Sequence, residues 1–193
     1  YNNYKDSLGT IPTLYNASHL FIKSRPGGKS RAASRGLVDS LRQRILDGED
    51  FARLAEQFSN DPGSARNGGE LGFVSRGTFV PAFERIAYAL SPGEISGLVE
   101  TDFGYHIIEA LEVLGDKVNV RHILVSPSVS VADEDSLYDF TSFLRNSIKT
   151  EEDFSFLAKR HSDDVSTKEV GGRLGWVDPN AFPIEEIGKV LLS

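Results

Sequence analysis

The sequence has no cysteine and no methionine, and it has a single tryptophan. Without cysteine the chain forms no disulfide, no thiolate nucleophile and no cysteine-based zinc site. No apolar run approaches the roughly 18 residues that a membrane span needs, and no charged-then-apolar leader stands at the start. Because the chain begins at Tyr1 and lacks methionine, we expect it to be a piece of a longer protein. The missing leader therefore indicates no compartment.

Basic residues are also in deficit, with 21 Lys and Arg against 28 Asp and Glu and a net charge of −7. Nucleic-acid binding depends on Lys and Arg that neutralise phosphates, so we expect no nucleic-acid partner. The composition, 39% hydrophobic and 25% charged, is typical of a globular protein. A length of 193 residues allows one large domain or two domains of about 100 residues.

An internal repeat decides between these two organisations. One offset of 103 residues, without a gap, aligns identical residues in the two halves of the chain. The aligned pairs include His19 with His122, Phe51 with Phe154, Ser59 with Ser162, Asp61 with Asp164, Gly68-Gly69 with Gly171-Gly172, Leu71-Gly72 with Leu174-Gly175, and Phe79 with Phe182. Chance does not preserve glycine pairs, an acid and aromatics together. A period this long indicates tandem domains and not a solenoid.

Short apolar runs predict the strands of each copy. Residues 17–23 and 120–125 are rich in β-branched or aromatic side chains, and each run begins beside a histidine. Residues 71–75, 94–100 and 104–113 predict three further strands in copy one.

Apolar residues at steps of three and four predict an amphipathic helix in each copy. In copy one they are Leu37, Leu41 and Ile45, and in copy two Leu137, Phe140, Leu144 and Ile148. Asp50 and Asp153 stand where an N-cap would begin a second helix. A third helix is expected over residues 81–90, before the break at Ser91-Pro92-Gly93. The pattern predicts an α+β domain with an antiparallel-rich sheet.

Several of these segments, in this order, resemble the parvulin (rotamase, PpiC-type) family. The matching strings are Ser18-His19-Leu20-Phe21-Ile22-Lys23, Asp50-Phe51 to Phe58-Ser59, Gly68-Gly69-Glu70-Leu71-Gly72, Phe79-Val80-Pro81-Ala82-Phe83-Glu84, Ser91-Pro92-Gly93-Glu94-Ile95-Ser96, and Thr101-Asp102-Phe103-Gly104-Tyr105-His106-Ile107-Ile108. Each string alone is weakly specific, but their ordered combination over about a hundred residues is highly specific.

The resemblance implies a four-stranded antiparallel sheet surrounded by four helices. Residues 14–113 would form one complete parvulin domain after a lead-in of residues 1–13. Residues 114–118 would be a linker, and residues 119–193 a second parvulin domain that ends before its last strands.

The resemblance also implies a set of site residues. Its catalytic group would be His19, Asp61, Thr101 and His106, which share a polar network on the sheet. Its proline pocket would be formed by Leu71, Phe79 and Phe83, together with Phe103, where some members have serine. No metal ligand and no cofactor belong to this set.

The implied activity is peptidyl-prolyl cis-trans isomerisation. Rotating an X-Pro amide makes and breaks no bond, so no nucleophile is required. Asp61 stands where some parvulins carry cysteine, and the chain has no thiol. We therefore expect noncovalent catalysis by preferential binding of the twisted amide.

Tandem parvulin domains resemble the SurA-type chaperone isomerases of the bacterial periplasm. This resemblance implies a periplasmic or otherwise extracytoplasmic protein that is not inserted in the membrane. Its clients would be unfolded or extended proline-containing proteins, outer-membrane proteins among them. The alternative is a noncatalytic chaperone module that binds extended aromatic-rich segments on the same groove.

Two further features bear on function. A basic cluster follows the first strand and consists of Lys23, Arg25, Lys29, Arg31 and Arg35. We interpret it as a solvated loop and not as a phosphate reader, because it lacks the expected arginine pair. Copy two keeps His122, Asp164, Leu174 and Phe182, but its match ends after Phe182 and it has no counterpart of residues 92–113. We expect copy two to be inactive.

Overall fold

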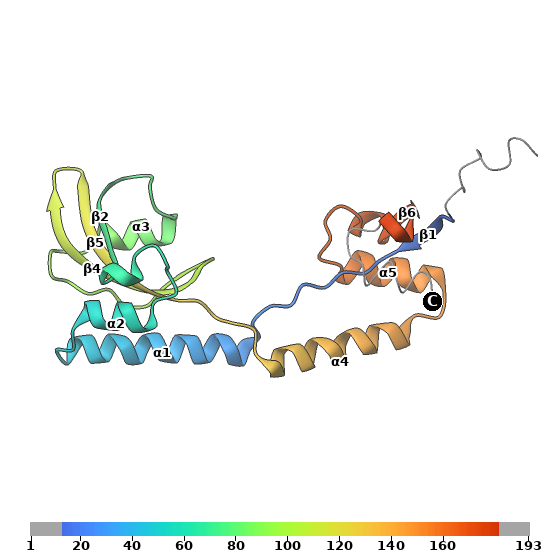
Figure 1. Cartoon of the computed structure of the whole chain (residues 1–193), viewed down its shortest axis with the longest axis horizontal. Coiled ribbons are helices and arrows are strands. Elements are labelled where there is room, and N and C mark those ends of the chain that lie inside the picture. The colour runs from blue at the N-terminus through green and yellow to red at the C-terminus, as the bar shows by residue number, and fades with distance from the viewer. Residues whose placement is uncertain (1–12, 182–193) are drawn as a thin grey trace, which may run out of the picture. The chain divides into compact units, whose positions relative to one another are not determined.

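The chain folds into two structural units, which a computed structural model describes over residues 13–181 (Figure 1). Arg25–Glu134 form one unit, here named the central unit. The other, named the split unit, combines residues 13–24 with residues 135–181 of the described chain. Phe182 and the point where the repeat loses its match lie outside the described residues.

The central unit is built on a four-stranded antiparallel sheet with the order β2-β5-β4-β3. Its strands are β2 (Glu70–Ser75), β3 (Val99–Thr101), β4 (Gly104–Leu114) and β5 (Lys117–Val125). Its helices are α1 (Gly28–Leu46), α2 (Phe51–Phe58) and α3 (Pro81–Ala87), with a 3-10 turn, η2, at Ala65–Asn67. The predicted α+β class and the four-stranded antiparallel sheet are confirmed.

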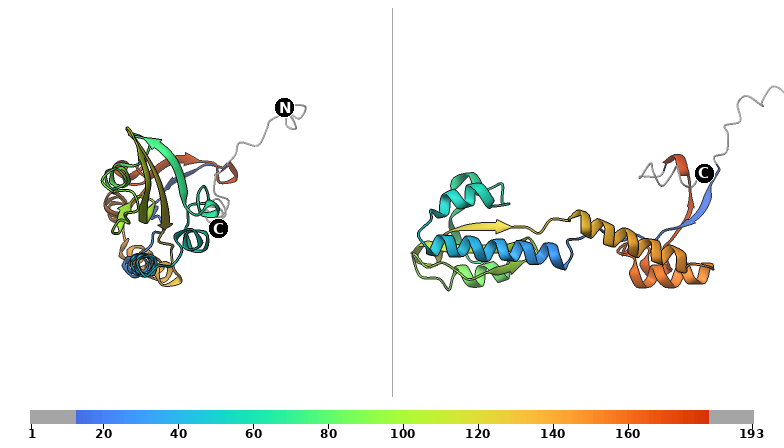
Figure 2. Two further views of the ribbon diagram at one scale, coloured as in Figure 1. Left: turned by 90° about the vertical axis from the view of Figure 1, so that its left-hand side faces the viewer. Right: turned by 90° about the horizontal axis from the view of Figure 1, so that it is seen from below.

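Alternation along β4 and β5 gives the sheet two covered faces. Tyr105 and Ile107 of β4 pack with Val38, Leu41 and Ile45 of α1 and with residues of α2. On the opposite face, Ile108 packs with Val118 and Val120 of β5 and with Phe83 and Ala87 of α3. Figures 1 and 2 show α1 and α3 on opposite sides of the strands. Each cluster is a small hydrophobic core.

A two-residue turn joins β4 to β5 as a hairpin. Gly115 and Asp116 lie between the strands, and Gly115 takes a φ of 61°, in the left-handed region that glycine favours. The register then runs from Leu114↔Lys117 to Tyr105↔Val125. The structure therefore places residues 114–118 in a hairpin, where the sequence predicts a linker.

The split unit contains β1 (Tyr15–Ser18), which pairs antiparallel with β6 (Arg173–Val177). Its helices are α5 (Glu151–His161) and most of α4 (Val131–Ser147), with 3-10 turns η3 at Lys168–Val170 and η4 at Pro179–Ala181. Residues 14–24 therefore lie outside the 14–113 domain that the sequence predicts, and they belong with the body of the second repeat. The described chain has no helix long and apolar enough to cross a bilayer.

Caps and boundaries differ locally from the expectations. Asp50 caps α2 as predicted, since its carboxylate accepts a bond from the Arg53 amide. The prediction of Asp153 as an N-cap is wrong, because Thr150 caps α5 and Asp153 completes a capping box from within the helix. In α1, Val38 is buried where Leu37 was expected to face the core.

Candidate functional site

Two histidines of neighbouring strands form the floor of the candidate site. His106 of β4 and His122 of β5 are 4% and 6% exposed, and both lie on the sheet face that carries α3. Their rings stack with centroids 5.5 Å apart, and their Nδ1 atoms are 3.2 Å apart. A contact this short between two ring nitrogens requires a proton between them.

The partners of the two rings fix the direction of the hydrogen bonds. Nε2 of His122 lies 2.8 Å from Oδ2 of Asp61, and a carboxylate only accepts, so His122 donates there. In the neutral form of both rings, His122 then accepts from Nδ1–H of His106. Nε2 of His106 in turn accepts from the Thr101 hydroxyl at 2.8 Å. The result is one directed chain of bonds that ends on Asp61.

Local backbone structure places Asp61 at the end of this chain. The carboxylate follows α2 and accepts bonds from the Gly63 amide at 3.0 Å and from the Ser64 hydroxyl at 2.5 Å. Burial alone would raise the pKa of Asp61, but the bonds from Ser64, His122 and Gly63 outweigh it and lower the pKa below its ordinary value. Asp61 is therefore the ionised anchor of the site.

His106 is held in its neutral form. Burial, and then the neighbouring His122, lower the pKa of His106 to about 4, against a smaller opposing effect of Asp61. At neutral pH this ring is an uncharged hydrogen-bonding surface and not a cation.

An apolar pocket of about 380 Å³ stands over the histidines. The Phe83 ring meets the His106 ring edge to face at 5.3 Å, and the Phe79 ring lies 4.7 Å from Phe83. The remaining lining residues are Asp61, Leu71, Thr78, Val80, Phe103, His122 and Leu124. Phe103 is 62% exposed at the rim. The pocket can hold a small apolar ring against a polar floor.

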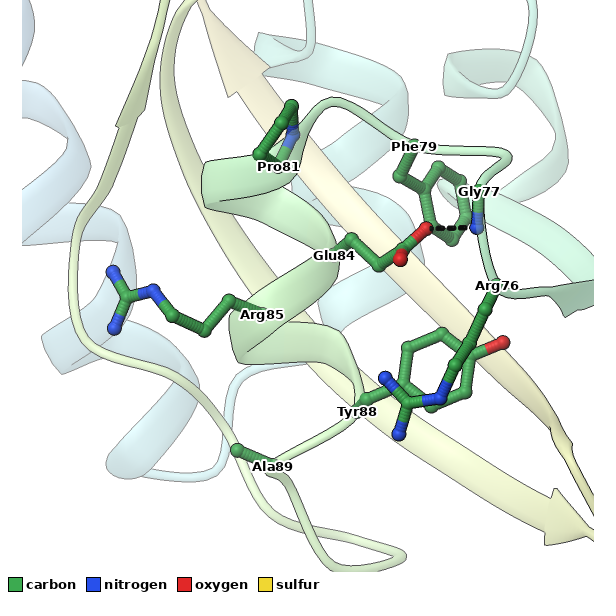
Figure 3. A pocket seen from close by; sticks show the side chains of 8 residues that line it. All are labelled: Arg76, Gly77, Phe79, Pro81, Glu84, Arg85, Tyr88 and Ala89. Carbon is green, nitrogen blue, oxygen red and sulfur yellow. Dashed lines mark hydrogen bonds between the residues drawn. The ribbon is translucent and has the colours of Figure 1, made fainter.

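A larger hollow of about 610 Å³ lies next to this pocket and contains no histidine (Figure 3). Phe79 lines both. In the hollow, the Glu84 carboxylate accepts a bond from the Gly77 amide at 2.7 Å, and the Arg76 guanidinium lies over the Tyr88 ring (Figure 3). These contacts hold the loop that carries Phe79. We place the candidate site in the smaller of these two pockets, because it combines apolar walls with the His106–His122 network.

The structure brings together all but one of the site residues that the sequence predicts. Asp61, Leu71, Phe79, Phe83, Phe103 and His106 line the pocket, and Thr101 bonds His106. His19 lies elsewhere, since its Nε2 bonds Asp164 at 2.6 Å and Thr167 at 3.0 Å in the split unit. His122 takes the position expected for His19, because the hairpin after β4 delivers β5 to that place in the sheet.

Ser64 was missed by the sequence analysis, and His122 was assigned to the second copy. The 103-residue offset aligns His122 with His19 and so carried the signal for His122. The same offset aligns Ser64 with Thr167, two residues that differ in identity but both carry a hydroxyl group. No group of three His, Asp or Glu side chains within residues 13–181 is placed to hold a metal ion.

Comparison with known proteins gives one family. The chain matches the model of the Rotamase family, described as a PPIC-type PPIASE domain, over residues 19–112 and again over residues 122–193. The two matches reproduce the internal repeat and support the resemblance inferred from the ordered motifs.

Curated relatives match one or both repeats. A chaperone SurA of Pseudoalteromonas atlantica is 29% identical over 185 residues, which are 92% of this chain and 43% of the relative. A foldase protein PrsA of Geobacillus kaustophilus is 39% identical over 112 residues, 58% of this chain and 34% of the relative. The chain thus spans less than half the length of these relatives. The crystal structure of a peptidylprolyl isomerase (PrsA) from Bacillus anthracis aligns with 71% of this chain and 54% of its own, at 24% identity and a TM-score of 0.37.

Proposed function

Because the chain belongs to the Rotamase family of PPIC-type PPIase domains, we propose that the central unit is a peptidyl-prolyl cis-trans isomerase. It acts noncovalently on X-Pro bonds in extended or unfolded protein segments. The observation that carries the proposal is the apolar pocket closed below by the stacked rings of His122 and of the neutral His106. In this proposal His122, His106, Asp61 and Thr101 form the catalytic network, and Leu71, Phe79, Phe83 and Phe103 bind the substrate.

Rotation of an X-Pro amide requires a binding surface of this kind and no nucleophile or cofactor. The barrier to amide rotation is about 18–20 kcal/mol, because the planar form is conjugated. The twisted amide has lost that conjugation, and its carbonyl is less polar than in either planar form. A site that binds the proline ring in an apolar pocket, over the neutral His106 ring, favours the twisted form over the planar ones. Phe79 and Phe83 hold the ring as a pivot, and the chain of bonds from Thr101 to Asp61 keeps the floor rigid.

The relatives bear on the biological setting. Kinship with the chaperone SurA and the foldase PrsA supports clients that are unfolded proteins and an extracytoplasmic location. Outer-membrane proteins are one class of client within this proposal. The same apolar walls also suit an aromatic side chain, which keeps noncatalytic binding of extended aromatic-rich segments as the alternative function.

An exchange experiment by NMR on an X-Pro peptide separates the two functions. The full chain should accelerate cis-trans exchange, and Phe79→Ala should lower kcat/KM about tenfold, equivalent to about 1.4 kcal/mol of transition-state binding. Phe73→Ala is the matched control, because Phe73 is a 43% exposed residue of β2 that does not line the pocket. It should stay within about twofold of the parent. Peptide binding without any acceleration would instead establish the noncatalytic chaperone.

A further inference from the structure

Each repeat in this chain holds the first strand of the other repeat. The segment of residues 15–22, which carries His19, lies against the body of the second repeat. The aligned segment of residues 118–125, which carries His122, lies against the body of the first. We use the name cradle for the groups that hold each segment. The central cradle consists of Ser59, Asn60, Asp61, Ser64 and Gly69, and the split cradle consists of Ser162, Asp163, Asp164, Thr167 and Gly172.

The backbone bonds in the two cradles correspond one to one at the 103-residue offset. His122 N–H donates to the Gly69 carbonyl at 2.9 Å, and His19 N–H donates to the Gly172 carbonyl at 2.8 Å. Two residues further along, the Leu124 and Phe21 amides donate to the hydroxyls of Ser59 and Ser162 at 3.2 and 3.3 Å. The carbonyls of Leu124 and Phe21 accept from the amides of Asn60 and Asp163 at 2.7 and 2.6 Å.

The histidine side chains repeat the same correspondence. Nε2 of His122 lies 2.8 Å from Asp61 and 3.1 Å from the Ser64 hydroxyl. Nε2 of His19 lies 2.6 Å from Asp164 and 3.0 Å from the Thr167 hydroxyl. Two segments of different apolar sequence thus make the same bonds in two cradles. His122 lies within β5, whereas β1 ends at Ser18, so the strand that the sequence predicts over residues 17–23 stops short of His19.

The glycines show how closely the strands approach. A Cβ atom added to Gly69 would stand 2.2 Å from the His122 carbonyl oxygen, and one on Gly172 would stand 2.1 Å from that of His19. Both cradles therefore recognise the backbone and the histidine of a strand, and these two features are common to both strands. Chain connectivity must then select the occupant. The two-residue turn between β4 and β5 favours the His122 strand in the central cradle, because closing so short a loop costs little entropy.

We propose that the tandem repeats have reciprocally exchanged their first strands, and that chain connectivity, not a difference between the cradles, selects which strand each cradle holds. The isomerase site of the first repeat is then completed by a histidine from the second repeat. This inference extends the proposed function, but its structural part stands without any enzymatic activity.

Engineered disulfides distinguish exchange from its absence, since the natural chain has no cysteine. Asn16 faces Trp176 across β1 and β6, and Phe73 faces Asn119 across β2 and β5. Without exchange the same positions would pair as Asn16 with Phe73 and Asn119 with Trp176, by the 103-residue offset. Facing residues of antiparallel strands stand within the Cα separation that a disulfide spans. Four double variants of the full chain therefore use the same four substitutions in two combinations.

The exchanged pairs, Asn16→Cys with Trp176→Cys and Phe73→Cys with Asn119→Cys, should oxidise nearly completely to monomeric crosslinked chains, as measured by mass spectrometry after tryptic digestion. The matched controls, Asn16→Cys with Phe73→Cys and Asn119→Cys with Trp176→Cys, should stay reduced. If the control variants formed disulfides and the exchanged pairs formed none, the proposed strand exchange would be refuted. Covalent dimers from the exchanged pairs would overturn it as well, since the strands would then pass between copies of the chain.

Activity gives an independent readout. His122→Ala should lower kcat/KM at least tenfold more than His19→Ala, because His122 lies under the pocket and His19 does not. The reverse order of the two variants would contradict the exchange. A parent chain without isomerase activity would refute the proposed function alone, and the disulfide pattern would still decide the exchange.

Discussion

Ser64 illustrates how one hydroxyl organises the candidate site. It is 2% exposed, donates to Asp61 and lies 3.1 Å from Nε2 of His122. Ser64→Ala removes one donor from the carboxylate, so the pKa of Asp61 should rise and the free energy of unfolding should fall by about 1–2 kcal/mol. Titration of the Asp61 carboxylate carbon by NMR and urea unfolding measure the two effects.

The split unit suggests the control for this variant. Thr167 occupies the position aligned with Ser64 and donates to Asp164 at 2.6 Å. Ser64→Thr should therefore preserve the low pKa of Asp61. A pKa that is unchanged in Ser64→Ala would show that the hydroxyl does not act on the carboxylate.

His106 makes stability depend on pH. Its pKa in the folded chain is about 4, below the value of about 6.5 in an unfolded chain. The unfolded state therefore binds the proton first, and the folded state loses stability as the pH falls from 6.5 toward 4. By pH 4 the loss should be about 3 kcal/mol. The measurement is the free energy of unfolding in urea at a series of pH values.

Asp61 affects a lower pH range, because its pKa in the folded chain lies below the ordinary value. Its contribution is present above the unfolded pKa of about 4 and is lost as the pH falls through the folded pKa. His106→Gln should therefore flatten the stability profile between pH 6.5 and 4 while leaving the loss below pH 4. A profile of the parent that is already flat in the upper range would contradict a neutral His106.

At the scale of the strand, the close approach of β5 to Gly69 predicts a large effect of a small substitution. Gly69 has a φ of 81°, and an added Cβ would press on the His122 carbonyl. Gly69→Ala should therefore cost more than about 2 kcal/mol of stability, through left-handed strain and displacement of the strand. Gly72→Ala is the matched control, since Gly72 has a similar φ of 72° but open space around it.

Gly72→Ala should lower the free energy of unfolding only by the cost of the left-handed backbone conformation, about 1 kcal/mol. Thermal unfolding of both variants measures the difference. Equal losses would mean that β5 does not lie against Gly69 in solution.

The strand boundaries show how far sequence patterns reach. The run of residues 104–113 closely predicts β4, a long strand whose pairing with β5 has one register shift, between Ala110 and Glu112. The run of residues 94–100 predicts a strand where only Val99–Thr101 forms one. There the Ser96 hydroxyl accepts the Ile108 amide in place of a ladder carbonyl. Hydrophobic periodicity predicts which side chains face the core, but it does not predict which atom accepts the hydrogen bond of each backbone amide.

At the scale of the whole chain, the two units differ in the amount of buried apolar surface. Both hydrophobic clusters of the described residues lie in the central unit. In the described part of the split unit, the buried apolar residues are Leu144 and Ala158. Amide hydrogen exchange should therefore be slowest in β4 and β5 and faster in α5. Exchange in α5 that is as slow as in β4 would contradict this ranking.

The candidate site could be predicted from sequence except for Ser64 and the origin of one strand. The ordered motifs that resemble the parvulin family predicted Asp61, Thr101, His106 and the pocket aromatics, and the structure places these residues at or beside one pocket. The motifs could not distinguish His19 from His122, because the cradle contacts are the same for both. Which of the two histidines lies in the central unit depends on loop lengths and on the β4–β5 turn. These features do not affect which residues occur within either segment.

The position of β5 along the chain also sets an order of events during synthesis. Translation proceeds from the N-terminus, and domains begin to fold as they emerge. When residues 59–69 leave the ribosome, the strand with His19 already exists and the strand with His122 does not. The nascent first repeat can therefore contact the segment that carries His19 before the segment that carries His122 has been synthesised. If the segment that carries His19 enters the central cradle first, the proposed exchange requires its later displacement by residues 117–125.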